Sequence, residues 1–213
     1  MSSVFQFLLR GKTLGRALFT EEVRKHTQNL NGEVIDLGSG VNPSYLTVLP
    51  SSISHVATDK FLPKEKGLSI DLNEILPFED SSVKTFFCFN VLYILDNPEK
   101  FLHEVNRTLV PGGVLLLSSP LIWNEIPEPH DYARYTGEGI TRMLTRAGFL
   151  NVSVTRYGER FSAASNLLDP FLYFKIVRIP VHLLALLLDK IVPAKMKSQY
   201  PAPIGYFVIA KKS

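Results

Sequence analysis

The sequence predicts an α/β protein built on a doubly wound, mostly parallel sheet with helices on both faces. Short runs rich in Val, Ile and Phe alternate along the chain with segments in which apolar residues recur at helical spacing. Such alternation implies right-handed crossovers between parallel strands, which place helices on both faces of the sheet. A chain of 213 residues, of which 46% are hydrophobic and 20% charged, is long enough for one such domain.

The expected elements follow from local residue patterns. A basic amphipathic helix is predicted over residues 4–29. Two further helices are predicted at 97–109, where Asn97 is a favourable N-cap, and at 137–147, which Gly148 terminates. Strands are predicted, from their apolar residues and spacing, at 33–37, 56–59, 68–71, 83–91, 114–118, 151–156 and 204–211.

The chain divides into an N-terminal basic helical segment, residues 1–30, and a domain over 31–213. An apolar helical insertion at about 159–200 separates the last two strands and is too long for an ordinary connection. Two basic residues, a proline and a histidine interrupt it, so we do not expect a membrane span. Two interpretations stay open: the insertion covers the pocket or the core, or it lies on a lipid surface through residues 1–20 and 165–195.

Charge is distributed unevenly along the sequence. Residues 1–30 carry five basic and two acidic residues, and residues 156–213 carry nine basic and three acidic ones. This favours an anionic partner near the two ends, either a membrane surface or a phosphorylated substrate. Nucleic acid is not expected, because the basic residues are not densely clustered.

The single cysteine and the N-terminal residues indicate the cellular compartment and whether a metal site is expected. The one cysteine, Cys88, is expected in the core, and no cluster of ligands predicts a metal site. The N-terminus lacks the pattern of a signal peptide, so a cytoplasmic protein is expected, with membrane association as an addition.

Acidic residues follow three successive predicted strands. Asp36 is followed by Gly38 and Gly40, and Asp59 comes 19 residues after Gly40. An acid at about this spacing accepts hydrogen bonds from ribose hydroxyls in nucleotide-binding sheets. Asp71, with the next apolar residue, is suited to the amino group and faces of a purine. The third glycine of a dinucleotide motif is absent, which disfavours a nicotinamide cofactor.

The chain resembles the type 11 branch of class I S-adenosylmethionine-dependent methyltransferases. The resemblance covers roughly residues 30–155 and the last strand, through the stretches VIDLGSG (34–40), ATDKF (57–61), DLNEILPFEDSSVKTFFCFNVLYIL (71–95) and FLHEVNRTLVPGGVLLLSSP (101–120). It implies a Rossmann-like sheet of seven strands in the order 3-2-1-4-5-7-6, with the last strand antiparallel. It also implies S-adenosyl-L-methionine as cofactor.

The resemblance assigns cofactor contacts by position. The first strand and its loop would meet the amino-acid end, the second the ribose, the third the adenine and the fourth the methionine part. The residues so assigned are Asp36, Gly38, Ser39, Gly40, Asp59, Lys60, Asp71, Leu72, Asn90 and Val91. The family often has His where this chain has Tyr93, so no catalytic role is transferred to that position.

Catalytic candidates lie in the polar loop that follows the fifth strand. His130 is a general base or substrate clamp, or else it orders the loop. Asp131 orients His130 or caps the next helix, and Tyr132 walls the pocket. Arg134 binds an acidic substrate group or pairs with a carboxylate such as Asp131 or Glu128.

The predicted function is transfer of a methyl group from S-adenosylmethionine to a small-molecule, glycan or lipid-linked acceptor by in-line displacement. Two alternatives are a non-catalytic cofactor-binding module with the same fold and, less favoured, a nicotinamide-dependent oxidoreductase. The sequence does not indicate the oligomeric state.

Overall fold

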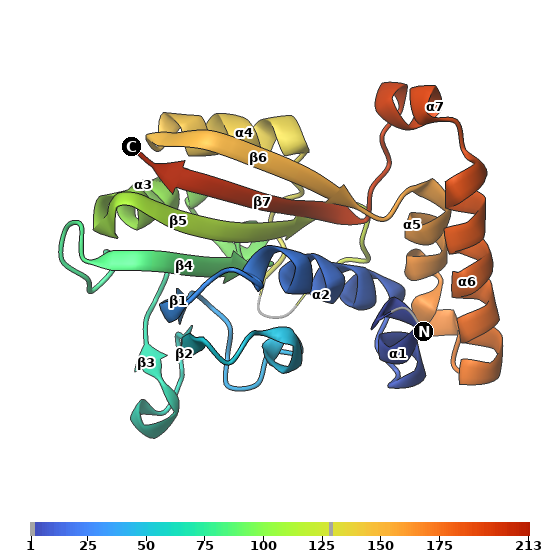
Figure 1. Ribbon diagram of the computed structural model, residues 1–213, viewed down its shortest axis with the longest axis horizontal. Helices are drawn as coiled ribbons and strands as arrows, with labels where there is room; N and C mark the ends of the chain where they lie inside the picture. The colour runs from blue at the N-terminus through green and yellow to red at the C-terminus, as the bar shows by residue number, and fades with distance from the viewer. Residues whose placement is uncertain (1–2, 128–129) are drawn as a thin grey trace.

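The computed structural model describes residues 3–127 and 130–213 and contains one seven-stranded mixed sheet (Figure 1). The strands run in the order β3-β2-β1-β4-β5-β7-β6. Their bounds are β1 Gly32–Asp36, β2 Ile53–Asp59, β3 Leu68–Ser69, β4 Val83–Phe89, β5 Leu109–Pro120, β6 Phe149–Tyr157 and β7 Gly205–Lys212. β7 pairs antiparallel with both β5 and β6, while the pairs among β1 to β5 are parallel. The predicted fold class, strand order and antiparallel last strand are confirmed.

Helices cover both faces of this sheet. The α-helices are α1 Ser3–Leu9, α2 Leu14–Thr27, α3 Pro98–Thr108, α4 Gly137–Arg146, α5 Arg160–Leu167, α6 Lys175–Ile191 and α7 Ala194–Gln199. The short 3-10 turns are η1 Leu46–Val48, η2 Lys64–Lys66, η3 Leu92–Ile94 and η4 Asp169–Phe171.

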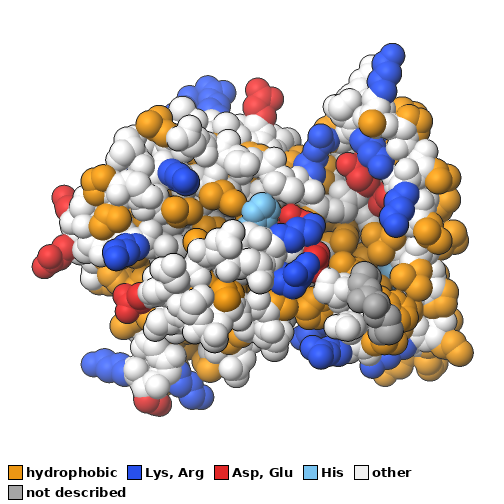
Figure 2. Space-filling view, viewed as in Figure 1, with side chains coloured by type: hydrophobic (Ala, Val, Ile, Leu, Met, Phe, Trp, Pro, Cys, Tyr) orange, Lys and Arg blue, Asp and Glu red, His pale blue; other side chains and the backbone are white. Residues whose placement is uncertain are grey.

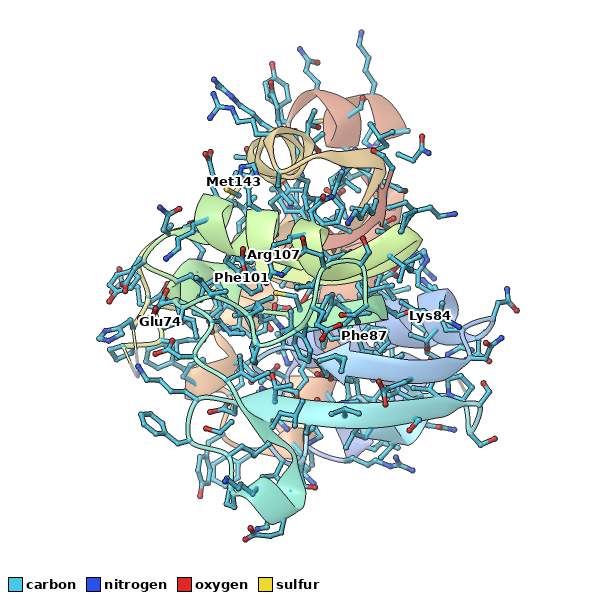
Figure 3. All side chains as sticks on the ribbon, turned by 90° about the vertical axis from the view of Figure 1, so that its left-hand side faces the viewer. Glu74, Lys84, Phe87, Phe101, Arg107 and Met143 are labelled. Atoms are coloured by element: carbon cyan, nitrogen blue, oxygen red, sulfur yellow. The ribbon has the colours of Figure 1, made fainter. Side chains whose placement is uncertain are left out.

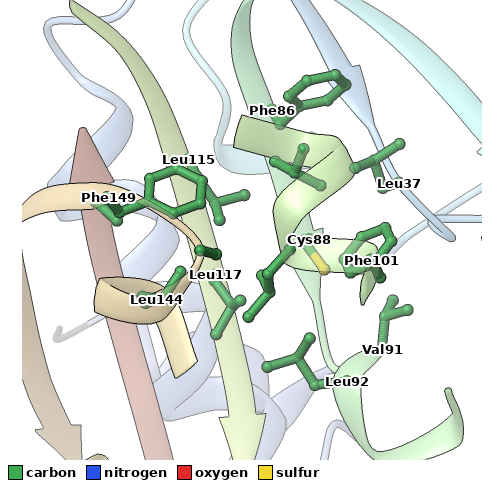
Figure 4. Packing of buried hydrophobic residues seen from close by; sticks show 14 of the residues in the cluster. Leu37, Phe86, Cys88, Val91, Leu92, Phe101, Leu115, Leu117, Leu144 and Phe149 are labelled. Carbon is green, nitrogen blue, oxygen red and sulfur yellow. The ribbon is translucent and has the colours of Figure 1, made fainter. Parts of the chain in front are cut away.

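The central strand β4 shows how the sequence divides the core between the two faces. Successive side chains of a strand point to opposite faces of a sheet. Phe86 and Cys88 therefore pack on the face covered by α3 and α4 (Figure 4), and Phe87 and Phe89 pack on the face covered by α2 and α5. Burial on both faces explains why this strand reads as a nearly continuous apolar run.

Two predicted elements differ most in extent, while several strands differ from prediction by two or three residues at one end. The helix expected over 4–29 is broken into α1 and α2, because Gly11 adopts φ +83 and the Thr13 side chain caps the N-terminus of α2. The fifth strand begins at Leu109 rather than 114. Its Pro-Gly-Gly sequence lies in a register irregularity within β5 instead of stopping the strand.

The segment between β6 and β7 contains α5, α6 and α7, which Figure 1 shows to one side of the sheet. The side chain of Asp189 on α6 accepts hydrogen bonds from the backbone N–H groups of Phe161 and Ser162, at 2.9 and 3.0 Å. It thereby satisfies free donors in the first turn of α5 and fixes the two helices to each other. Among the described residues, no helix is both long and apolar enough to cross a bilayer.

Candidate functional site

Two cavities adjoin at the carboxyl ends of the parallel strands, where open α/β sheets bind their ligands. The larger cavity, about 650 Å³, lies over the ends of β1, β2 and β4. The smaller cavity, about 320 Å³, lies between the sheet and α2. Gly38, Asn90 and Tyr93 line both cavities, so these three residues mark the boundary between them.

The loop after β1 approaches its neighbours so closely that it requires glycine. Gly38 has φ +73, and its N–H donates to Thr58 Oγ1 at 3.1 Å. A Cβ atom at Gly38 would lie 2.9 Å from Val91 Cγ2 and 3.3 Å from Leu72 Cδ1. Both of those side chains line the larger cavity. The missing Cβ of Gly38 therefore leaves open a cradle next to two apolar walls, as a flat ligand requires.

The other residues of this loop lie around the same boundary. Gly40 also has a positive φ, +65, and a Cβ there would lie 4.0 Å from Asp59 Oδ2. Ser39 lines the smaller cavity, and its hydroxyl donates to the Gly40 carbonyl at 3.0 Å.

Asp36 lies behind the loop and is absent from the lining of both cavities. Its side chain is fully buried, and Oδ2 accepts a hydrogen bond from the Tyr45 hydroxyl and is bonded to His55 Nε2, each at 2.7 Å. Burial raises the pKa of the Asp36 carboxyl, and the bonds to His55 and Tyr45 oppose that rise. Asp36 thus acts on the smaller cavity through Tyr45, which is one of its walls.

Carboxylates from the ends of β2 and β3 border the larger cavity. Asp59 Oδ1 has one weak donor, the N–H of Phe61 at 3.4 Å, which leaves the carboxylate free to accept hydrogen bonds from a ligand. Asp71 accepts from the N–H of Asn73 at 3.0 Å and pairs with Lys60 Nζ at 2.7 Å. The hydrogen bond from Lys60 lowers the pKa of Asp71. Two acidic groups and the apolar side chains beside them fit a nucleoside with hydroxyl and amino groups.

α3 holds the connection that follows Asp71. Arg107 (Figure 3) donates to the carbonyl oxygens of Leu76 and Phe78, each at 3.1 Å, and Glu104 accepts from the Leu76 N–H at 3.2 Å. The hydrogen bond from Arg107 lowers the pKa of Glu104. These contacts position the loop whose first residues, Asp71 and Leu72, wall the larger cavity.

Asn90 occupies the boundary of the two cavities in an unusual conformation. Its φ is +58, a left-handed value that is uncommon for residues other than glycine. The N–H of Asn90 donates to the Ser118 carbonyl at 2.9 Å, and the Ser118 hydroxyl donates to Asn90 Oδ1 at 3.1 Å. The strand β4 therefore ends at Phe89, two residues before the predicted end at Val91, and both Asn90 and Val91 line the larger cavity.

The catalytic candidates of the loop after β5 separate into two pairs. His130 and Tyr132 have stacked rings with centroids 5.1 Å apart, and both line the larger cavity. Asp131 forms an ion pair with Arg134, in which Nη2 and Oδ2 are 2.6 Å apart, and Asp131 also accepts from the Ile126 N–H at 2.9 Å. The Arg134 guanidinium lies 5.2 Å from the centre of the Tyr93 ring.

The pairing of Asp131 decides between the predictions made for it. Asp131 neither caps α4, whose N-cap is Thr136, nor orients His130. Arg134 binds Asp131, which is one of the two carboxylates considered, whereas Glu128 lies outside the described residues. The pair therefore fixes the loop across the cavities, and the assignment of catalytic roles to these residues stays a prediction.

We expect this pair to contribute stability that depends on pH. The hydrogen bond from Arg134 lowers the pKa of Asp131, so the contribution is present above the ordinary carboxyl pKa and is lost as pH falls through the lowered value. Asp131→Asn should lower the free energy of unfolding at pH 7 by on the order of 1 kcal/mol, and less at pH 3. Urea denaturation at both pH values measures this, with Asp80→Asn, in which the replaced carboxylate is 78% exposed, as the control. Equal losses at both pH values would contradict the assignment.

Sequence reasoning missed most of the smaller cavity. Its outer wall comes from Gly15, Arg16 and Phe19 of α2. The N–H of Gly15 donates to Asn166 Oδ1 of α5 at 2.8 Å, and a Cβ at Gly15 would overlap the Trp123 ring. The signal in the sequence is Gly15 itself, because an isolated glycine within a helical pattern can mark close packing.

Aromatic residues dominate the smaller cavity, and its chemistry is limited. Burial raises the pKa of the Tyr45, Tyr93 and Tyr157 hydroxyls, so all three stay protonated at neutral pH. Among the described residues that line this cavity there is no Asp, Glu or His, and the one charged side chain is Arg16. The cavity thus has a flat apolar wall at Trp123, a cation and no general base.

Comparison with known proteins places these features in a family. Residues 38–117 match a family model described as a methyltransferase domain. The chain is 28% identical over 127 residues to thiol S-methyltransferase TMT1B of Rattus norvegicus, covering 55% of this chain and 49% of that protein. It is 30% identical over 155 residues to tRNA U34 carboxymethyltransferase of Psychrobacter arcticus, covering 65% and 41%. The chain spans no more than about half the length of these curated relatives.

The solved structures bear on the fold. A SAM-dependent methyltransferase from Archaeoglobus fulgidus superimposes with a TM-score of 0.59 at 16% identity, covering 92% of this chain and 94% of that one. One of the curated relatives is named for its action on tRNA. The expectation that nucleic acid is not a partner therefore has no support from the comparisons. The match of residues 38–117 to a methyltransferase domain and the seven-stranded topology, which is that of an S-adenosylmethionine-dependent methyltransferase structure, support a class I methyltransferase domain with S-adenosylmethionine as cofactor.

Proposed function

We propose that this protein transfers the methyl group of S-adenosylmethionine to a nucleophile that enters the smaller cavity. The observation that carries the proposal is the junction of the two cavities at Gly38, Asn90 and Tyr93. A cofactor in the larger cavity and an acceptor in the smaller one would meet at this junction, as in-line displacement requires.

Different residues of the larger cavity bind different parts of the cofactor. Asp59 accepts the ribose hydroxyls, because its carboxylate borders the cavity and has one weak donor. Asp71 and Leu72 meet the adenine, and Lys60 holds Asp71 in place. Gly38 and Asn90 contact the methionine part. When bound, S-adenosylmethionine supplies a methyl group on a sulfonium, and its leaving group is a neutral thioether.

The lining of the smaller cavity favours an acceptor that ionises without help from the protein. The three tyrosine hydroxyls keep their protons, and the described lining residues include no carboxylate or imidazole. A thiol, with an ordinary pKa of about 8.5, supplies enough thiolate near neutral pH to react unaided. Arg16 stabilises the thiolate, and the aromatic wall holds its apolar part. The relative named as a thiol S-methyltransferase supports this choice.

The size of the smaller cavity, about 320 Å³, suits a small molecule or the end group of a glycan or a lipid-linked acceptor. Within this class, we favour a small apolar thiol. Trp123 forms part of the cavity wall, and its indole ring can stack on a flat or sugar-like group.

The test measures formation of S-adenosylhomocysteine by the full chain with aromatic and alkyl thiols, the matching alcohols and carboxylates, a sugar alcohol and tRNA. We expect turnover with thiols that increases as pH approaches the thiol pKa. Turnover with tRNA alone would contradict the acceptor class. Binding of S-adenosylhomocysteine without turnover on any acceptor would favour the non-catalytic module.

Arg16 provides a sharper test of the acceptor site. Arg16→Met should raise the KM for a thiol about 2- to 5-fold, because one exposed cation contributes up to about 1 kcal/mol to an anion nearby. Its affinity for S-adenosylhomocysteine should not change, since Arg16 lines the smaller cavity only. Arg142→Met, on the far helix α4, serves as the matched control and should alter neither value. An unchanged KM in Arg16→Met would show that the acceptor binds elsewhere.

A further inference from the structure

The helix α6 departs from the usual pattern of a helix at a protein surface. Two of its ionisable residues, His182 and Asp189, are buried against the protein, with 0% and 7% of their surface exposed. Ile179 and Leu186 pack against α1 and α2, but other branched aliphatic residues of α6 point outward. A surface helix in water normally shows charged residues on the outer face and apolar ones on the inner face.

Specific bonds hold α6 in this orientation. His182 lies between the Ser165 hydroxyl, at 3.2 Å from Nδ1, and Asp169 Oδ1, at 2.8 Å from Nε2. Burial lowers the pKa of His182, and the bond to Asp169 opposes that effect. Asp189 caps α5 about two turns further along the helix. Because these polar contacts are buried, rotation of α6 to hide its apolar face would leave them without partners.

The outward face forms one continuous apolar stripe. Val177, Leu184, Leu187 and Ile191 are 48%, 56%, 58% and 75% exposed, and their spacing of seven, three and four residues places them along one side of the helix. Beside the N-terminal end of the stripe, the surface continues through exposed residues of the preceding segment and of the first turn of α6, which are Phe171, Tyr173, Phe174 and Ile176. Figure 2 shows hydrophobic side chains gathered over α6 at the right of the molecule. We call these eight residues the apolar stripe.

Basic residues flank the apolar stripe at both ends. Residues 170–200 include five basic residues and a single acidic one, the buried Asp189. At one end, Lys175 Nζ donates to the Leu9 carbonyl at 3.3 Å, which places it beside Arg10 of the α1 turn. At the other end lie Lys190 and Lys195. An outward face that is apolar in the middle and cationic at the ends complements a layer of anionic headgroups over hydrocarbon.

We infer that α6 docks the protein on an anionic lipid surface, with the apolar stripe at the boundary between headgroups and acyl chains. Tyr173 and the two exposed phenylalanines are the residue types that favour this boundary. The contact is peripheral, because no described helix is long enough to span the bilayer. The inference stands independently of the proposed reaction, since α6 lines neither of the two adjoining cavities.

The experiment is flotation of the full chain with vesicles of phosphatidylcholine alone and of phosphatidylcholine mixed with phosphatidylglycerol. We expect binding to the mixed vesicles that weakens as salt rises. Leu184→Glu should reduce this binding at least about 10-fold. The substitution replaces an apolar side chain that would be buried in lipid by a negative charge that the anionic vesicle surface repels. Leu150→Glu on β6 is the matched control, since Leu150 is 53% exposed and Leu184 is 56% exposed.

Three results would overturn the inference: no binding of the unaltered chain to mixed vesicles, equal binding by Leu184→Glu, and self-association that Leu184→Glu abolishes. The last result, measured by sedimentation velocity at the same concentration, would assign the apolar stripe to contact between two copies. Far-ultraviolet circular dichroism and urea denaturation establish that each variant is folded, and titration with S-adenosylhomocysteine is measured separately. A protein that binds vesicles but not this ligand would sink the proposed function and leave the lipid contact standing.

Discussion

Replacement of Asp59 by alanine should weaken the binding of S-adenosylhomocysteine by about 1–3 kcal/mol, on the order of 5- to 150-fold. The Asp59 carboxylate borders the larger cavity at the end of β2, and its one internal donor, the Phe61 N–H, is weak at 3.4 Å. Its capacity to accept hydrogen bonds is therefore available to the ribose hydroxyls. Isothermal titration calorimetry of the unaltered and variant chains measures the difference.

Glu65→Ala is the matched control for Asp59→Ala. It removes another carboxylate from the connection between β2 and β3, but Glu65 lies on η2, outside the lining of the larger cavity. We expect its affinity to equal that of the unaltered chain. Equal affinity in Asp59→Ala as well would show that the ribose, if bound at all, lies elsewhere.

Gly38→Ala should weaken S-adenosylhomocysteine binding at least about 10-fold, or by about 1.4 kcal/mol. The added Cβ would lie 2.9 Å from Val91 Cγ2, within the cradle that the ligand must enter. The positive φ of 73° adds backbone strain of roughly 1–2 kcal/mol, which lowers the free energy of unfolding as well. Binding and stability therefore need to be measured separately, by calorimetry and by urea denaturation.

Gly112→Ala separates the two effects. Gly112 also has a positive φ, +76, but a Cβ there would meet no atom within 4 Å. Both variants should lose similar stability, and the loss of ligand affinity should be confined to Gly38→Ala. Retained affinity in Gly38→Ala would place the cofactor away from the loop after β1.

The fold could be predicted from the sequence because the residue patterns that indicate its elements are local and consistent with one another. The apolar run of β4, the Asn97 cap of α3 and the Gly148 stop of α4 each fix one element. The extent of β5 was not readable, because Pro-Gly-Gly normally ends an element and here lies in a register irregularity that depends on the partner strand. The break between α1 and α2 has local causes instead, which are the positive φ of Gly11 and the Thr13 cap of α2.

Site residues that follow strand ends could be predicted from the sequence. Site residues that are brought together by packing between distant segments could not. Asp59, Asp71 and Asn90 come together because parallel strands end at one edge of the sheet. The position of α2 over the smaller cavity follows from contacts such as Gly15 with Asn166, which are 151 residues apart. Asp36 was predicted to contact the cofactor, but it is buried and bonded to Tyr45 and His55. The bond to His55 depends on the register between β1 and β2, which local sequence patterns do not give.

A crystal structure of the full chain with S-adenosylhomocysteine tests the central claim most directly. The ligand should occupy the larger cavity, with its ribose hydroxyls on Asp59, its adenine against Leu72 and its sulfur beside Asn90, facing the smaller cavity. A ligand bound at another place, or one whose sulfur is closed off from the smaller cavity, would contradict the account.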